Sequence, residues 1–247
     1  QSGHVRRVRD LIGLAVAISF LSRFPVRGRY STTDLARSVP WFPIVGALIG
    51  SLAGVAGWWA TTKIGALGAA FFTVAIGVMI TGALHEDGLA DTFDGLGAGG
   101  DKEAILTVMK DSRVGVFGVT ALILAVGLKA SLLTALPADR YVLVAGVAGA
   151  VSRASAVTMM KIFPPAASIG LAATLSPALS RSMVALTALI GVGAAALLGW
   201  PSAAGALLGW ASGLLVALWS WRVIGGVTGD TLGAVVVVSE LGVLALG

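Results

Sequence analysis

The sequence contains no cysteine among its 247 residues and only two histidines. Disulfide bonds, iron–sulfur clusters and thiolate zinc sites are therefore excluded, and His4 and His85 are the only imidazoles available for chemistry. Charged residues are also scarce, at 12%, against about 25% in ordinary soluble domains. Because so few charges cannot cover a globule of this size with a wetted surface, a soluble enzyme, a nucleic-acid-binding module and a disordered chain are all disfavoured.

Apolar residues dominate what is there, at 57% of the chain with a mean hydropathy of +0.94. A hydrocarbon core about 30 Å thick needs about 20 apolar residues in a helix. We therefore predict an all-α protein, a polytopic bundle of about seven transmembrane helices in one domain over residues 1–247. The predicted spans are 38–62, 64–84, 115–136, 141–160, two within 182–221 that turn at Trp200-Pro201, and 231–247.

The amino-terminal apolar run, 11–22, differs from the other runs. As a helix it rises only about 18 Å, which is too short to cross a bilayer. Because arginines flank both of its ends, we expect a re-entrant or interfacial helix. The first four residues, Gln1 to His4, resemble the remnant of a cleaved tag and carry no argument.

The distribution of basic residues predicts how the protein is oriented in the membrane. We place the segment 85–113 on the cytoplasmic side, called inside here, and let the seven spans alternate from it. Thirteen then lie inside: Arg6, Arg7, Arg9, Arg23, Arg27, Arg29, Arg37, Lys102, Lys110, Arg113, Lys161, Arg181 and Arg222. Only Lys63 and Arg140 lie outside. This positive-inside bias predicts a multi-pass membrane protein with residues 85–113 as a cytosolic acidic and basic loop. It also accounts for the net charge of +5 without a nucleic-acid partner.

The acidic residues are concentrated in that segment. Seven of the twelve lie there: Glu86, Asp87, Asp91, Asp94, Asp101, Glu103 and Asp111. The spacing of Asp87, Asp91 and Asp94 places them on one face if the helix continues. Like charges at that spacing repel, and a divalent cation removes the cost. Magnesium prefers carboxylate oxygen and commonly bridges to substrate phosphates. A solvated acidic loop is the alternative.

Two further segments support the magnesium interpretation. M-K-D-S-R-V-G-V-F-G, from Met109 to Gly118, carries Lys110 and Arg113, which could both reach a phosphate. G-G-V-T-G-D, from Gly225 to Asp230, offers a cap or a ligand at a helix N-terminus. Each has an ordinary explanation alone, as an anchor for a span or as a helix cap, but the predicted topology puts all three segments on one side.

The remaining charges are ambiguous in the sequence. Arg153 and Glu240 fall inside predicted spans, where a charge is a functional candidate by default and a structural ion pair is the competing interpretation. Lys129 can snorkel to the interface, and we give it no role. His85, beside a carboxylate, is more often structural than catalytic.

Taken together, H-E-D-G-L-A-D-T-F-D-G-L-G, M-K-D-S-R-V-G-V-F-G and G-G-V-T-G-D-T-L-G-A resemble the cobalamin synthase family, the adenosylcobinamide-GDP ribazoletransferases. The resemblance extends to F-L-S-R-F-P (Phe20 to Pro25) and W-F-P-I-V-G (Trp41 to Gly46), so it spans nearly the whole chain. One departure follows the fifth span, where this chain reads P-P-A-A-S-I-G-L, from Pro164 to Leu171, in place of an arginine-containing, glycine-rich stretch.

The resemblance implies a magnesium-dependent enzyme of the bacterial inner (plasma) membrane that joins adenosylcobinamide-GDP to α-ribazole, or its 5′-phosphate, and releases GMP. We expect one or two Mg²⁺ ions on Glu86, Asp87, Asp91, Asp94 and Asp230. Asp91 or Asp94 is expected to take the proton from the ribazole 5′-hydroxyl. Substrate contacts are expected from Lys110, Ser112, Arg113, Thr228, Arg23 and Arg153, with the loop from Arg23 to Arg37 walling the corrin. The other partner is the lipid bilayer, and a homo-oligomer is left open.

Two alternatives remain at this point. D-G-L-A, from Asp87 to Ala90, is similar to the start of the CDP-alcohol phosphotransferase signature, but the rest of that signature is missing. A secondary transporter would use Glu240 and Arg153 as coupling charges and would place its acids at mid-membrane. Here the acids cluster beside a span, which favours chemistry on a cytosolic substrate.

Overall fold

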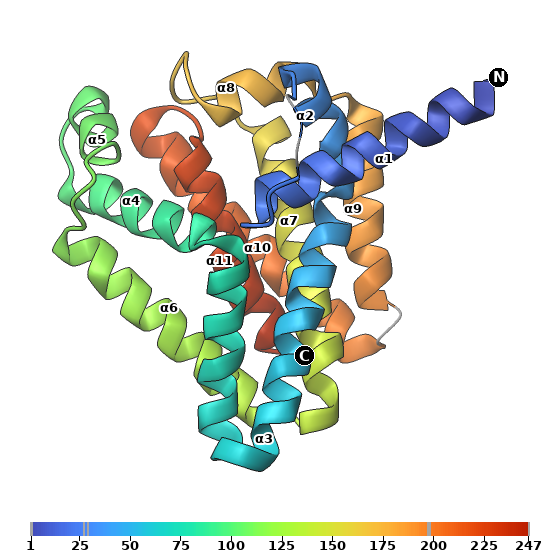
Figure 1. Cartoon of the computed structure of the whole chain (residues 1–247). Coiled ribbons are helices and arrows are strands. Elements are labelled where there is room, and N and C mark those ends of the chain that lie inside the picture. The colour runs from blue at the N-terminus through green and yellow to red at the C-terminus, as the bar shows by residue number, and fades with distance from the viewer. Residues whose placement is uncertain (1, 27, 29, 197–198, 247) are drawn as a thin grey trace.

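The computed structural model describes residues 2–26, 28, 30–196 and 199–246, with the side chains of residues 2–11 and 200–202 left aside. The predicted roles of Gln1, Arg27 and Arg29, and those of the side chains of Arg6, Arg7 and Arg9, lie outside this description. The protein is all-helical, as predicted, with one isolated bridge between Pro165 and Val227. Figure 1 shows the helices packed into one bundle.

Eleven α-helices and three short 3₁₀ turns follow one another along the described chain. They are α1 (Ser2–Leu21), α2 (Thr32–Ser38), η1 (Val39–Trp41), α3 (Phe42–Thr81), α4 (Leu84–Ala98), α5 (Lys102–Val108), α6 (Val116–Ala135), η2 (Ala138–Arg140), α7 (Tyr141–Ile162), α8 (Leu171–Leu175), η3 (Ser176–Ala178), α9 (Arg181–Ala196), α10 (Trp200–Ile224) and α11 (Gly229–Leu244).

The longest helix, α3, is folded into two antiparallel arms. Gly65 interrupts it with φ 72° and ψ 173°, a conformation that only glycine adopts readily. The arms then lie side by side, since a Cβ on Gly77 would lie 3.9 Å from the Cβ of Ala53. Figure 1 shows the chain reversing at this point, at the end of the bundle away from α4. The two predicted spans 38–62 and 64–84 correspond to these arms.

Within the residues that the structure describes, four helices are long and apolar enough to cross a membrane, in the segments Thr32–Thr81, Val116–Ala135, Ala138–Ile162 and Ala203–Ile224. The count is five if the pair Leu171–Ala178 and Arg181–Ala196, bent by 104°, forms one broken span. The seven predicted spans are therefore not confirmed as a number, although each falls on a helix or an arm of one. The difference arises because α3 is counted once and because α9 and α11 have only 16 residues each.

α11 forms the centre of the bundle. Most of its residues are buried, and it packs against α4, α7 and α10. The core around it combines residues of α1, α3, α4, α7 and α11, including Leu89, Val157 and Val235. The predicted last span is therefore a protein-enclosed helix, and a polar residue on it meets other helices rather than lipid.

The segment predicted as a loop over 85–113 is largely helical, which corrects that expectation. α4 begins as soon as α3 ends, and Asp101 caps α5 by accepting a hydrogen bond from the Ala104 N–H at 2.9 Å. The acidic residues of the first turn favour the helix because they face the positive end of its dipole. The acids are thus held on a rigid element.

Candidate active site

A sharp turn between α3 and α4 sets the direction of the acidic helix. Gly82 and Ala83 both have left-handed φ values, 66° and 61°, and the Ala83 N–H donates to the Val78 carbonyl. The Asp87 N–H then donates to the Ala83 carbonyl at 2.8 Å, so α4 starts without a linker. Figure 1 shows α4 running across the end of the second arm of α3.

Two glycines let α4 cross α11 at very short range. A Cβ on Gly88 would lie 2.7 Å from the Asp230 carbonyl oxygen and 3.2 Å from the Gly233 Cα, so no side chain fits there. This contact puts Asp87 and Asp91 of α4 close to Asp230 in the first turn of α11. Residues separated by about 140 positions in the sequence thus form one acidic group.

The charges of this group act on one another. The pKa of Asp91 is raised to about 6, first by burial and then by the negative charges of Asp87, Asp230 and Asp94. Burial also raises the pKa of Asp230, and the charge of Asp87 adds to the shift. The protein alone therefore disfavours the fully ionised group, and a bound cation would remove that cost.

Carboxylate oxygens are suitable ligands for Mg²⁺. Among the described residues, however, no three His, Asp or Glu side chains converge closely enough to form a metal site by themselves. The fit is therefore partial, and the phosphates of a substrate would have to complete the coordination. The predicted magnesium dependence stays a prediction.

The carboxylate of Asp94 binds backbone amides, unlike those of Asp87 and Asp91. Its Oδ2 accepts a hydrogen bond from the Gly115 N–H at 2.7 Å, and its Oδ1 accepts one from the Gly118 N–H at 2.8 Å. These two amides belong to the start of α6, so the buried carboxylate of Asp94 caps that helix. Each oxygen thus accepts one hydrogen bond from a helix terminus, and the predicted metal-binding and catalytic roles of Asp94 stay predictions.

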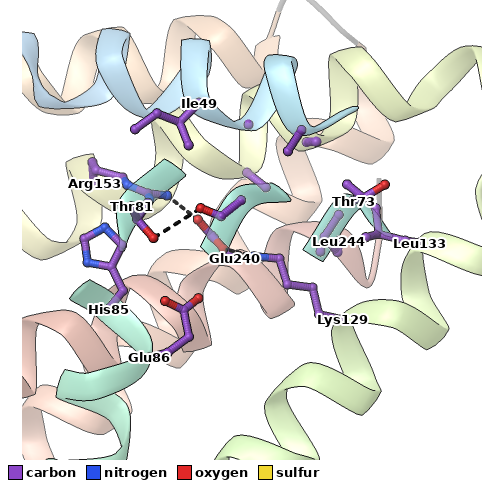
Figure 2. A pocket seen from close by; sticks show the side chains of 15 residues that line it. Ile49, Thr73, Thr81, His85, Glu86, Lys129, Leu133, Arg153, Glu240 and Leu244 are labelled. Atoms are coloured by element: carbon purple, nitrogen blue, oxygen red, sulfur yellow. Dashed lines mark hydrogen bonds and ion pairs between the residues drawn. The ribbon is translucent and has the colours of Figure 1, made fainter. Parts of the chain in front are cut away.

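Glu86 faces a second polar cluster, shown in Figure 2. There Glu240 pairs with both Arg153 and Lys129 around a small cavity of about 40 Å³. Three atoms around it are buried without a hydrogen-bond partner: Glu86 Oε2, His85 Nε2 and Arg153 Nε. The cavity is large enough for ordered water, which would satisfy them. Glu86 is thus separated from the other acids by the body of α4.

His85 is neutral in this setting. Its pKa is lowered to about 3, first by burial and then by the charge of Arg153. An imidazole that stays unprotonated at neutral pH cannot donate a proton as a general acid. This agrees with the structural interpretation of His85.

Two larger cavities meet at Asp230. The first, of about 300 Å³, has mainly apolar walls and is bordered by Asp87, Arg153 and Asp230. The second, of about 240 Å³, is bordered by Lys110, Thr228 and Asp230. Gly229 and Leu171 also line both. Asp230 therefore lies where two compartments adjoin, Asp87 borders the first of them, and Asp91 lines neither.

Comparison with known proteins then relates this arrangement to a family. A family model described as cobalamin-5-phosphate synthase matches residues 13–247. The chain belongs to the cobalamin-5-phosphate synthase family. No solved structure matches it.

Curated relatives of this synthase family are similar over nearly the whole chain. A protein of Bradyrhizobium diazoefficiens is 39% identical over 245 residues, which cover 96% of this chain and 94% of the relative. One from Rhizobium meliloti is 40% identical over 245 residues, 94% of each chain. One from Azorhizobium caulinodans is 37% identical over 256 residues, 97% of this chain and 96% of the relative. All three are named adenosylcobinamide-GDP ribazoletransferase.

Of the substrate contacts that the family resemblance implied, Lys110, Thr228 and Arg153 line the cavities. Thr228 also caps α11, where its hydroxyl accepts from the Thr231 N–H at 3.1 Å. Arg113 instead forms an exposed ion pair with Asp111 at 2.6 Å, and hydrogen bonds from Arg113 lower the pKa of Asp111 to about 2. Ser112 beside it is exposed and lines neither of the two large cavities.

Arg23 lies beside the site rather than in it. Its backbone N–H donates to the Ile80 carbonyl at 2.8 Å, and its side chain lies across Gly82. It therefore braces the turn between α3 and α4, and it lines neither large cavity. The predicted substrate contacts of Arg23, Ser112 and Arg113 stay predictions.

The segment in which this chain departs from the synthase family pattern turns out to be a wall of the second cavity. The Val227 N–H donates to the Pro164 carbonyl and the Ala166 N–H to the Val227 carbonyl, each at 2.9 Å. This pairing fixes the stretch from Ala167 to Leu171 against G-G-V-T-G-D. This role was not predicted from the sequence. The sequence signals that could have indicated it are the Pro-Pro pair and the glycine of this segment, which are typical of a fixed turn.

Proposed function

We propose that this protein joins adenosylcobinamide-GDP to α-ribazole or its 5′-phosphate and releases GMP. Its family membership and the names of its relatives support this activity. The observation that carries the proposal in this chain is the position of Asp230 on the border of two ligand-sized cavities, with Asp87 on the wall of one of them and Asp91 close enough for its charge to interact with both. Phosphoryl transfer depends mainly on positioning and on charge neutralisation, and such a site can supply both.

The bonds that change define what the site must do. A ribose oxygen of the acceptor attacks the phosphorus that carries the cobinamide arm, and the bond from that phosphorus to the bridging oxygen breaks. GMP leaves with the bridging oxygen, and the acceptor hydroxyl loses its proton. If the product keeps a 5-phosphate, as the family description indicates, the acceptor 5′-oxygen is already esterified. The attacking group is then a secondary ribose hydroxyl, which replaces the 5′-hydroxyl expected from the sequence.

In this proposal Asp91 takes that proton, because its raised pKa of about 6 gives it a basicity suited to neutral pH. Asp87 and Asp230 would hold Mg²⁺, whose charge would stabilise the leaving phosphate. Lys110 offsets the charge on the nucleotide phosphates. Asp94 and Glu86 have no direct part, since the first caps α6 and the second faces another cavity.

We also propose that the protein lies in the bacterial inner membrane with this site facing the cytoplasm. The positive-inside distribution of the sequence supports that orientation. In Figure 1, α4, α5 and α8 lie toward one end of the bundle, and the reversal of α3 lies at the other. The substrates are large, charged and water-soluble, which fits a site open to the cytosol.

One experiment tests the activity. Purified protein in detergent receives adenosylcobinamide-GDP, α-ribazole and Mg²⁺, and GMP is measured with and without a chelator. We expect GMP and a cobalamin product in equal amounts, and loss of both with chelator. Absence of GMP from folded protein would remove the proposed activity. GMP formation unaffected by chelator would retain the transferase and remove the magnesium.

The two alternatives give different outcomes. A CDP-alcohol phosphotransferase would release CMP from a CDP-alcohol and no GMP from the substrates above. A transporter would need mid-membrane charges free to bind a coupling ion. Glu240 is instead paired with two cations, Arg153 and Lys129, which favours a structural role for that group.

A further inference from the structure

The two cavities on either side of Asp230 differ in their chemistry. The 300 Å³ cavity has walls of apolar side chains, including Val157, Met160 and the stacked rings of Phe20 and Phe42, whose centroids are 5.5 Å apart. The 240 Å³ cavity also has mainly apolar walls, including Leu106, Met109 and Val227, but it carries Lys110. The cavities thus differ in the charge that they offer to a ligand, which suits two ligands of different charge.

We infer that the cavities divide the substrates: the 300 Å³ cavity takes the aromatic base of α-ribazole, and the 240 Å³ cavity takes the guanosine diphosphate end of the donor. This assignment rests on the proposed function and deepens it. The corrin occupies neither cavity and extends from their junction toward the cytosol.

The walls of the first cavity argue for the acceptor there. Both cavities are too small for a corrin, and the apolar part of the 300 Å³ cavity suits a bicyclic aromatic ring. The aromatic and aliphatic walls match the apolar faces of that ring. Asp87 and Asp230 border the same cavity, so a ribose hydroxyl of a base bound there lies near carboxylates.

Charge argues for the nucleotide in the second cavity. Lys110 forms no ion pair with any described residue, so its charge is available to a phosphate. The basic residue of the first cavity, Arg153, is already paired with Glu240. Of the cations that line the two cavities in the described part of the chain, Lys110 is the one without an ion pair.

The geometry of the reaction agrees with this division. In phosphoryl transfer the attacking and leaving oxygens lie on opposite sides of the reacting phosphorus. An acceptor in one cavity and a leaving nucleotide in the other would place that phosphorus at their shared border, beside Asp230. The cobinamide arm, the third substituent, then points away from both.

A matched pair of substitutions tests the assignment. Ala156→Phe fills the first cavity and Ala173→Phe fills the second, since each alanine lines only one of them. We expect Ala156→Phe to raise KM for α-ribazole by about tenfold or more and to leave KM for adenosylcobinamide-GDP within about twofold. Ala173→Phe is expected to give the opposite pattern. If either variant fails to fold, as judged by its melting curve, the corresponding Ala→Leu variant takes its place.

A second measurement uses charge instead of volume. Lys110→Gln is expected to weaken inhibition by GMP about tenfold while KM for α-ribazole stays unchanged, because a lost ion pair at a phosphate is a local effect. The reversed pattern of KM values, or equal effects on both substrates in both variants, would overturn the assignment. Absence of GMP release by the unmodified protein would instead overturn the proposed function.

Discussion

At the scale of the residue, the acids of α4 divide into three kinds although they stand within nine positions. Asp87 and Asp91 face Asp230, Asp94 is bonded to two backbone amides of α6, and Glu86 faces the cluster around Glu240. Charge alone does not distinguish them. Their neighbours do, and each kind of neighbour leads to a different expectation on substitution.

Asp91→Asn is expected to abolish GMP release, because an amide cannot accept the proton of the attacking hydroxyl. The folded state should be little affected, since the substitution removes a half-buried carboxylate that Asp87 and Asp230 repel. Turnover and the melting temperature in detergent are the measurements. A large fall in melting temperature would contradict the catalytic role and indicate a structural one.

The raised pKa of Asp91 predicts a pH dependence of metal binding. A divalent cation held by Asp87 and Asp230 would disfavour the proton on the neighbouring Asp91 carboxyl group, whose pKa is about 6 in the metal-free protein. Affinity for Mn²⁺, followed by electron paramagnetic resonance, should therefore rise about tenfold per pH unit below about 6 and level off above it. In Asp91→Asn the dependence in this range should be lost. An affinity that is constant from pH 5 to 7 in the unmodified protein would contradict the prediction.

At the scale of the element, a side chain of α4 caps the neighbouring helix α6. Asp94 supplies both acceptors for the amides of Gly115 and Gly118 at the start of α6. Asp94→Ala should lower the free energy of unfolding by about 2 kcal/mol, since it removes a charged helix cap. Asp94→Asn keeps one acceptor oxygen, so it should lower the free energy of unfolding by less. Unfolding in detergent, followed by circular dichroism, measures both, and loss of turnover with unchanged stability would contradict the capping role.

The helices α6, α7 and α11 are joined by Glu240, which pairs with Lys129 and Arg153. Glu240→Gln leaves the guanidinium of Arg153, only 4% exposed, without its counter-charge. Removing one partner of a buried ion pair lowers the free energy of unfolding by about 3–5 kcal/mol. Lys129→Met should cost less, because the side chain of Lys129 is 22% exposed and Arg153 still neutralises Glu240. Equal losses in the two variants would contradict this ranking.

At the scale of the whole molecule, the absence of cysteine makes the proposed orientation directly testable. Two single-cysteine variants serve this test, Ala98→Cys at the end of α4 and Lys63→Cys before the reversal of α3. Both positions are exposed, and they lie at the two ends of the bundle. In intact spheroplasts, a membrane-impermeant maleimide should label Lys63→Cys and should label Ala98→Cys only after lysis. The opposite labelling would place the acidic group outside the cytoplasm and contradict the proposed access of the substrates.

The sequence by itself determined the class of this protein, because a chain with 12% charge and long apolar runs has no stable alternative to helices in a bilayer. It also located the three polar segments and indicated their family. It did not reveal that 85–113 is helical, since helical periodicity and a capped loop both accommodate acids at these spacings.

Only the tertiary structure decided which acids act together. Helical spacing fixes the direction in which a side chain points, but the neighbour that it meets comes from another part of the chain. Thus Gly88 and Gly233 bring Asp230 to Asp87, while the start of α6 takes Asp94. Long-range packing governs these encounters because a charge at a membrane rim is stable only where an amide, a cation or a ligand is close enough to compensate it.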